Sequence, residues 1–182
     1  MTERNLACPD EVDAILADIQ ALLGYDEVPA WATRIAHVPH LLQALWINLK
    51  GFMQCSELSP LLQELVIFTI SRHNRSTYCM NYHAANALTL HATLSYQELV
   101  AISDDNSNGI IPDHYRTAIR IAIAYAGGVR QFNADDIAAL TAQGFSDTQI
   151  TELAGLILMS NAFNMYALNL DDKGELCSSC RE

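Results

Sequence analysis

The sequence has few basic residues: ten lysines and arginines are set against twenty-one aspartates and glutamates, which gives a formal net charge of -11. The acidic residues are scattered along the chain rather than gathered in one block. Because proteins bind phosphate backbones through clustered Lys and Arg, this composition argues against nucleic-acid binding. An excess of one charge is typical of a soluble surface.

Signals for export and for membrane insertion are also missing. The opening MTERNLACPDEVDAIL has no basic region followed by an apolar run, so no secretory signal is expected. The most apolar segment, LAGLILMSNAFNMYALNL, contains three asparagines and a serine and follows Glu152, which argues against a membrane span. We therefore expect a cytoplasmic protein with no membrane partner.

A secreted disulfide framework is not indicated, because the cysteines are odd in number and unevenly spaced, at positions 8, 55, 79, 177 and 180. Glycine and proline are modest in number, and no low-complexity run interrupts the 182 residues, half of which are hydrophobic. We expect one folded domain over residues 1–170, followed by an exposed tail, DDKGELCSSCRE, over residues 171–182.

Strand signals are absent, since valine is scarce and no run alternates at period two. Helical periodicity with start and stop signals recurs instead, as in the spacing of Val12, Ile15 and Ile19 before Gly24. Ser95 with Glu98, and Ser146 with Gln149, form capping-box patterns. The sequence predicts an all-α protein with helices over residues 12–23, 37–53, 59–74, 75–91, 95–102, 112–128, 133–144 and 146–168.

One predicted helix contains a candidate reactive thiol. With Ser76 or Thr77 as N-cap, Cys79 falls in the first turn, where unpaired N–H groups and the helix dipole lower a thiol pKa. His83 follows at i+4 on the same face. A tight turn at Asn74 and Arg75 would bring Glu64, on the preceding helix, beside the imidazole and complete a proton relay.

Simpler interpretations of the same residues stay open. A free cysteine is often a small buried hydrophobe, and Glu64 could pair with Arg72 rather than with His83. Cys79, His83, Cys177 and Cys180 could also form a four-ligand zinc site if the tail folded back. We favour a redox role over zinc and expect no metal or other cofactor.

The segment ELVIFTISRHNRSTYCMNYH resembles the core motif of the AhpD-like, or carboxymuconolactone decarboxylase, family. That motif is a glutamate, eleven residues, Cys-x-x-Cys, three residues and a histidine. Glu64, Cys79 and His83 match three of its four positions, while Ser76 replaces the first cysteine. A second block, ALTAQGFSDTQITELAGLILMSNAFNMYA, is also similar, so the resemblance covers roughly residues 37 to 170.

The resemblance implies an AhpD-like bundle of about seven to eight helices that assembles into a homo-oligomer, from dimer to hexamer. It also implies that Cys79 attacks a hydroperoxide, that His83 and Glu64 relay the proton, and that Ser76 and Tyr78 are auxiliary neighbours. Ser76 cannot form the family's local disulfide with Cys79, so resolution would need an external thiol reductant or the second Cys-x-x-Cys, Cys177 and Cys180.

Three functions remain open from the sequence. The first is a thiol-dependent, antioxidant peroxidase that acts on a small hydroperoxide through Cys79. The second is a cofactor-free lyase or isomerase that uses His83 and Glu64 on a small organic acid. The third is a non-catalytic helical oligomer.

Overall fold

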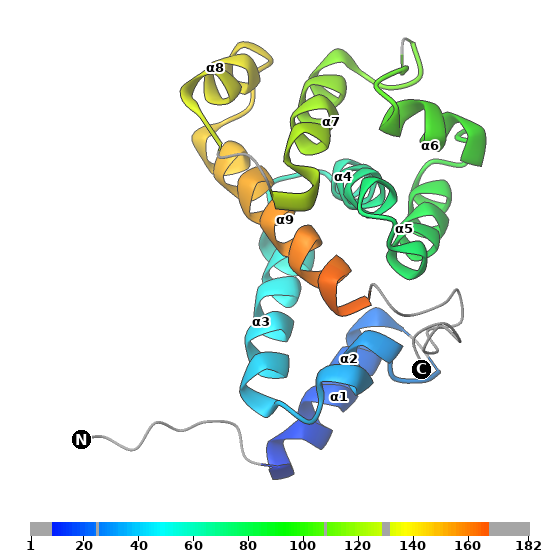
Figure 1. The fold of residues 1–182 in the computed structure, drawn as a ribbon, viewed down its shortest axis with the longest axis vertical. Helices are drawn as coiled ribbons and strands as arrows, with labels where there is room; N and C mark the ends of the chain where they lie inside the picture. The colour runs from blue at the N-terminus through cyan, green and yellow to red at the C-terminus, as the bar shows by residue number, and fades with distance from the viewer. Residues whose placement is uncertain (1–8, 25, 108, 129–131, 168–182) are drawn as a thin grey trace. The chain divides into compact units, whose positions relative to one another are not determined.

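The computed structural model describes residues 9–24, 26–107, 109–128 and 132–167, in which every regular element is a helix (Figure 1). The predicted all-α fold is confirmed for this part of the chain. The described residues divide into two compact units, the first ending at Cys55 and the second beginning at Ser56. The expected single domain over residues 1–170 stays a prediction, and the expected tail lies outside the described residues. No described helix has the length and apolarity needed to cross a bilayer.

The first unit contains α1 (Pro9–Leu23), α2 (Ala30–Ile35) and α3 (Pro39–Cys55). Ile19 of α1 and Trp46 of α3 are buried. The Trp46 Nε1–H donates to Asp18 Oδ2 at 2.7 Å, and the Lys50 ammonium pairs with the same oxygen at 2.7 Å. Hydrogen bonds from Lys50 and then Trp46 lower the pKa of Asp18, so this carboxylate fastens α1 to α3.

The short helix α2 was missed by the sequence analysis. It has only six residues, so it offers less than two turns of periodicity to recognise. Trp31, Ala32 and Ile35 are buried, which shows that α2 is stabilised by packing rather than by its own helix propensity.

The second unit is built around α4 (Pro60–His73). Seven of its side chains are buried, on all sides of the helix, so it lacks an exposed polar face. It packs most extensively on α5 (Thr77–Leu90), and also on α6 (Tyr96–Ser103), α7 (Asp113–Tyr125) and α9 (Asp147–Ala167). Figure 1 shows α4 among these helices; a 3-10 turn (Ala126–Gly128) and α8 (Ala134–Ala142) complete the unit.

Helix ends in this unit follow the predicted capping signals. The Ser95 Oγ accepts from the Glu98 N–H at 3.2 Å, and Glu98 Oε2 accepts from the Ser95 N–H at 2.8 Å. Ser146 and Gln149 make the same reciprocal pair at the start of α9, at 3.0 and 3.1 Å. These capping boxes are confirmed, and they explain why the boundaries of α6 and α9 could be predicted closely.

Candidate functional site

A tight turn between α4 and α5 brings the candidate residues together. Arg75 adopts a left-handed backbone conformation with φ of 59°, and the Ser76 N–H donates to the Ser71 carbonyl at 2.9 Å. The chain therefore reverses within three residues after α4, at the turn predicted near Asn74 and Arg75. Because α4 and α5 then run back along one another, Glu64 on α4 faces His83 on α5.

His83 and Glu64 form a close, partly buried pair. The His83 Nδ1 and Glu64 Oε2 atoms are 2.6 Å apart, and the two side chains are only 16% and 19% exposed. A carboxylate accepts, so Nδ1 carries the donated proton, and Nε2 is the ring nitrogen that could accept a proton as a base. The second carboxylate oxygen, Oε1, accepts from the Asn86 amide at 3.3 Å.

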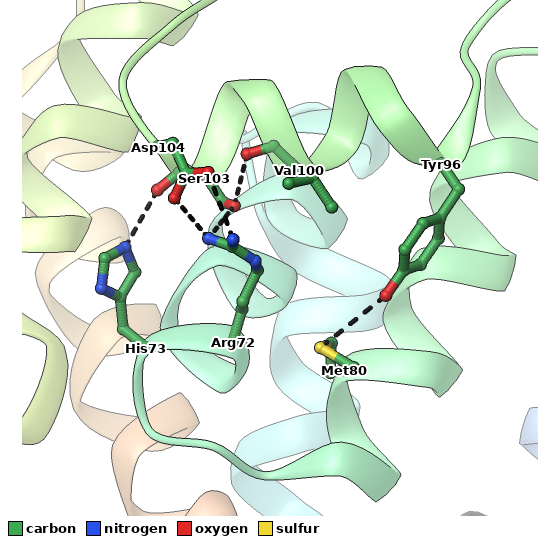
Figure 2. A network of polar contacts seen from close by, with 7 residues as sticks. All are labelled: Arg72, His73, Met80, Tyr96, Val100, Ser103 and Asp104. Carbon is green, nitrogen blue, oxygen red and sulfur yellow. Dashed lines mark hydrogen bonds and ion pairs between the residues drawn. The ribbon is translucent and has the colours of Figure 1, made fainter.

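Arg72 is engaged elsewhere, so the simpler interpretation of Glu64 as its ion-pair partner is wrong. The guanidinium of Arg72 binds Asp104 through both terminal nitrogens and donates to the Ser103 hydroxyl at 3.0 Å. Figure 2 shows this network, in which His73 also contacts the Ser103 carbonyl at 2.9 Å. These bonds fasten the end of α4 to the end of α6 and leave the Glu64 carboxylate to His83.

Cys79 lies in the first turn of α5, as predicted, but its surroundings favour the neutral thiol over the thiolate. The residue is only 9% exposed, and burial raises the pKa of the Cys79 thiol. The Ser76 hydroxyl opposes that rise in part. The expectation of a lowered pKa is therefore wrong for this conformation, because burial disfavours the charged thiolate and raises the pKa of the thiol.

Ser76 and Tyr78, the two auxiliary residues, occupy different settings. Ser76 is the N-cap of α5, as one of the two predicted choices, but its side chain makes no capping hydrogen bond. Its hydroxyl is fully buried and makes no hydrogen bond of ordinary geometry among the described residues, but it lies close enough to Cys79 to lower the pKa of the thiol in part. Tyr78 is half-buried in the first turn of α5. The tail cysteines, Cys177 and Cys180, lie outside the described residues.

Two site residues were missed by the sequence analysis. Asn86 holds the Glu64 carboxylate, and Tyr82 shares a hydrogen bond with Asn86 and packs its ring against the ring of His83. The sequence contains a signal for both residues, because one helix face is defined by the i, i+3, i+4, i+7 spacing of positions 79, 82, 83 and 86. That spacing identifies a face of α5 but not the side chain that α4 presents to it.

Within the described ranges, no group of three or more His, Cys, Asp or Glu side chains is arranged to hold a metal ion. The zinc alternative depends on Cys177 and Cys180 and so lies partly outside the described residues. What the described geometry offers is a histidine and carboxylate pair for proton transfer, one helical turn from a buried thiol.

Solved structures share this fold, although no family model and no curated protein matches the sequence. One is an uncharacterised peroxidase-related protein with an alkylhydroperoxidase AhpD core from Ralstonia eutropha JMP134, at 21% identity over 89% of this chain and 84% of that one, with a TM-score of 0.68. An uncharacterised peroxidase-related protein from Silicibacter sp. TM1040 has 22% identity over 92% and 87%, with a TM-score of 0.71.

A third similar structure is a cysteine-to-alanine variant of the debrominase Bmp8 in complex with 2,3,4-tribromopyrrole. It has 15% identity over 99% of this chain and 92% of that one, with a TM-score of 0.70. The chain thus has the AhpD-like fold, and the resemblance drawn from its motif is confirmed at the level of the fold.

Proposed function

We propose that the protein is a thiol-dependent, peroxidase-like oxidoreductase in which Cys79 is the nucleophile and His83, oriented by Glu64, is its general base. The observation behind the proposal is the 2.6 Å pair of His83 and Glu64 one helical turn from a buried cysteine. A nucleophile, a base and a group that orients the base are the parts that nucleophilic catalysis requires.

The raised pKa of Cys79 determines the order of events. At neutral pH the resting thiol is protonated, so the proton must leave as the substrate reacts. The Nδ1–H donated to Glu64 leaves Nε2 as the acceptor, and the carboxylate stabilises the imidazolium that forms. The Cys79 sulfur would therefore stay a neutral, unreactive thiol until a substrate is bound, rather than being a thiolate in the resting protein.

With a hydroperoxide, Cys79 would be oxidised and the peroxide reduced to an alcohol. The Cys79 sulfur attacks the terminal peroxide oxygen, the O–O bond breaks, and the thiol proton passes through His83 to the leaving alkoxide, which gives an alcohol and a cysteine sulfenic acid. An external thiol then condenses with the sulfenic acid and releases water. A second thiol restores Cys79 and leaves the reductant as a disulfide.

The reducing half of the cycle distinguishes this chain from a Cys-x-x-Cys enzyme. Ser76 fills the place of a resolving cysteine, and a hydroxyl cannot form a disulfide with Cys79. We expect the reductant to be an external thiol, with the Cys177 and Cys180 pair of the same or a neighbouring subunit as the alternative. We also expect a cytoplasmic homo-oligomer, as sequence and resemblance imply.

A second candidate is thiol-dependent removal of bromine from an aromatic ring, favoured by the likeness to the debrominase structure with bound tribromopyrrole. Here Cys79 would take the bromine as a sulfenyl bromide while the ring carbon receives a proton. An external dithiol would then release bromide and become a disulfide. Both candidate functions need a thiol and a proton relay, so they differ in which substrate oxidises Cys79.

The experiment measures consumption of an alkyl hydroperoxide, and separately release of bromide from a bromopyrrole, with dithiothreitol as reductant. We expect Cys79→Ser to abolish turnover and Cys55→Ser, which changes the exposed cysteine of α3, to leave it unchanged. Mass spectrometry with a sulfenic acid trap should label Cys79 in the wild type. Equal rates for wild type and Cys79→Ser would contradict both thiol mechanisms.

The same variants also test the lyase alternative. A proton-transfer reaction on a small organic acid would need His83 and Glu64 but not the sulfur. Activity on such an acid that survives Cys79→Ser and is lost in His83→Ala would replace the oxidoreductase proposal with that alternative.

A further inference from the structure

The amide of Asn86 is directed at the one oxygen of the Glu64 carboxylate that His83 does not use. Asn86 Nδ2 lies 3.3 Å from Oε1, while His83 Nδ1 lies 2.6 Å from Oε2. Two donors on the two oxygens fix the plane of a carboxylate, because rotation about its last side-chain bond would break one contact or both. Asn86 thus restricts the orientation of the Glu64 carboxylate, and this carboxylate in turn orients the His83 imidazole.

Tyr82 in turn restrains Asn86. The two residues are four apart on α5, on the face that also carries His83, and their side chains share a hydrogen bond. The Tyr82 ring lies 4.9 Å from the His83 ring at 86°, a T-shaped contact that limits tilting of the imidazole. Burial raises the pKa of the Tyr82 hydroxyl, so the hydroxyl stays neutral across the physiological range.

We propose that Asn86 is a positioning residue for the proton relay: it holds the Glu64 carboxylate so that His83 keeps its proton on Nδ1. Tyr82 in turn holds the Asn86 amide in this orientation. The consequence for rate rests on the proposed function, but the consequence for the imidazole does not. Neither residue contacts the reacting atoms in this assignment; both act through Glu64 and His83.

The decisive measurement is the tautomer of neutral His83, obtained from the ¹⁵N shifts of its ring nitrogens in the full-length protein. The wild type should show the Nδ1–H form. Asn86→Ala should give a mixture with the Nε2–H form. Asn86→Asp keeps the size of the side chain but loses its donor and places a carboxylate beside Glu64, so it should disturb the tautomer at least as much.

Thr89→Ala is the matched control. Thr89 lies on the same helix, is exposed, and bonds only to the Ala85 carbonyl among the described contacts. It should leave the tautomer and the rate as in the wild type. Tyr82→Phe, which removes only the hydroxyl, should fall between the control and Asn86→Ala. Far-ultraviolet circular dichroism confirms that each variant folds.

Rates of the Cys79 reaction with a hydroperoxide supply the second readout. Loss of one hydrogen bond to a carboxylate sets an upper limit of roughly 100-fold, and because Asn86 acts only through Glu64 we expect a smaller fall, of about 5- to 10-fold, for Asn86→Ala. A lower rate with an unchanged His83 tautomer would make Asn86 merely structural and overturn the inference, as would a wild-type tautomer in Asn86→Asp. If the wild type does not react with peroxide but the tautomer changes as expected, the positioning role stands and the proposed function fails.

Discussion

Removing the charge of Glu64 while keeping its shape tests the proton relay most directly. Glu64→Gln retains an oxygen that can accept from His83 Nδ1, but the acceptor is neutral. A hydrogen bond to a charged group contributes about 1.5–3 kcal/mol and a neutral one about 0.5–1.5 kcal/mol. The expected loss of transition-state stabilisation is the difference, roughly 1–2 kcal/mol, or about 5- to 30-fold in rate.

Little of this difference should be lost to solvent screening, because the two side chains are only 16% and 19% exposed. The glutamine also places an N–H₂ group at the position of Oε1, against the Asn86 donor, unless the Asn86 amide turns over. The predicted fall therefore has two sources, the lost charge and the disturbed contact with Asn86. Both act through the imidazole of His83.

The assay is the second-order rate constant of Cys79 oxidation by an alkyl hydroperoxide, followed in a stopped-flow instrument, with mass spectrometry to confirm the oxidised residue. Glu27→Gln is the control, because it removes one exposed carboxylate far along the chain from Glu64. A Glu64→Gln rate within about two-fold of the wild type would refute the role of the carboxylate as the group that stabilises the imidazolium, since that role predicts at least about five-fold.

Three further predictions concern pH and stability. The pKa of the Cys79 thiol is raised in the folded state, so as the pH rises the unfolded chain loses this proton before the folded protein does. The free energy of unfolding should therefore fall above the ordinary thiol pKa of about 8.5, by at most about 1.4 kcal/mol per pH unit. The fall should stop once the pH passes the folded-state pKa. Urea unfolding of Cys79→Ala should lack that component, and an identical alkaline slope would contradict it. Phe68→Ala, at a fully buried position of α4, should cost about 3–5 kcal/mol in the same assay, and a cost below about 1 kcal/mol would show that α4 is not a rigid core helix. Ser95→Ala removes the cap of α6 and should cost about 1 kcal/mol, whereas Ser95→Asp, which keeps an acceptor, should restore most of it.

Helix positions could be predicted because their causes are local. The caps at Ser95 and Ser146 involve residues three apart, and the apolar spacing that follows them repeats with the helix period. α2 could not be predicted in this way, since burial of Trp31 and Ile35 stabilises it and burial is not visible in six residues of sequence.

The site shows the same division. The sequence alone determined that Cys79, His83, Tyr82 and Asn86 share one face of a helix, because that follows from their spacing. Only the tertiary structure decided that Glu64 meets His83 while Arg72 turns to Asp104, because that choice depends on how α4 packs against α5 and α6. It also decided that the pKa of the Cys79 thiol is raised: the position of Cys79 at a helix N-terminus can be predicted from the sequence, but the desolvation that raises the pKa comes from residues brought together by folding.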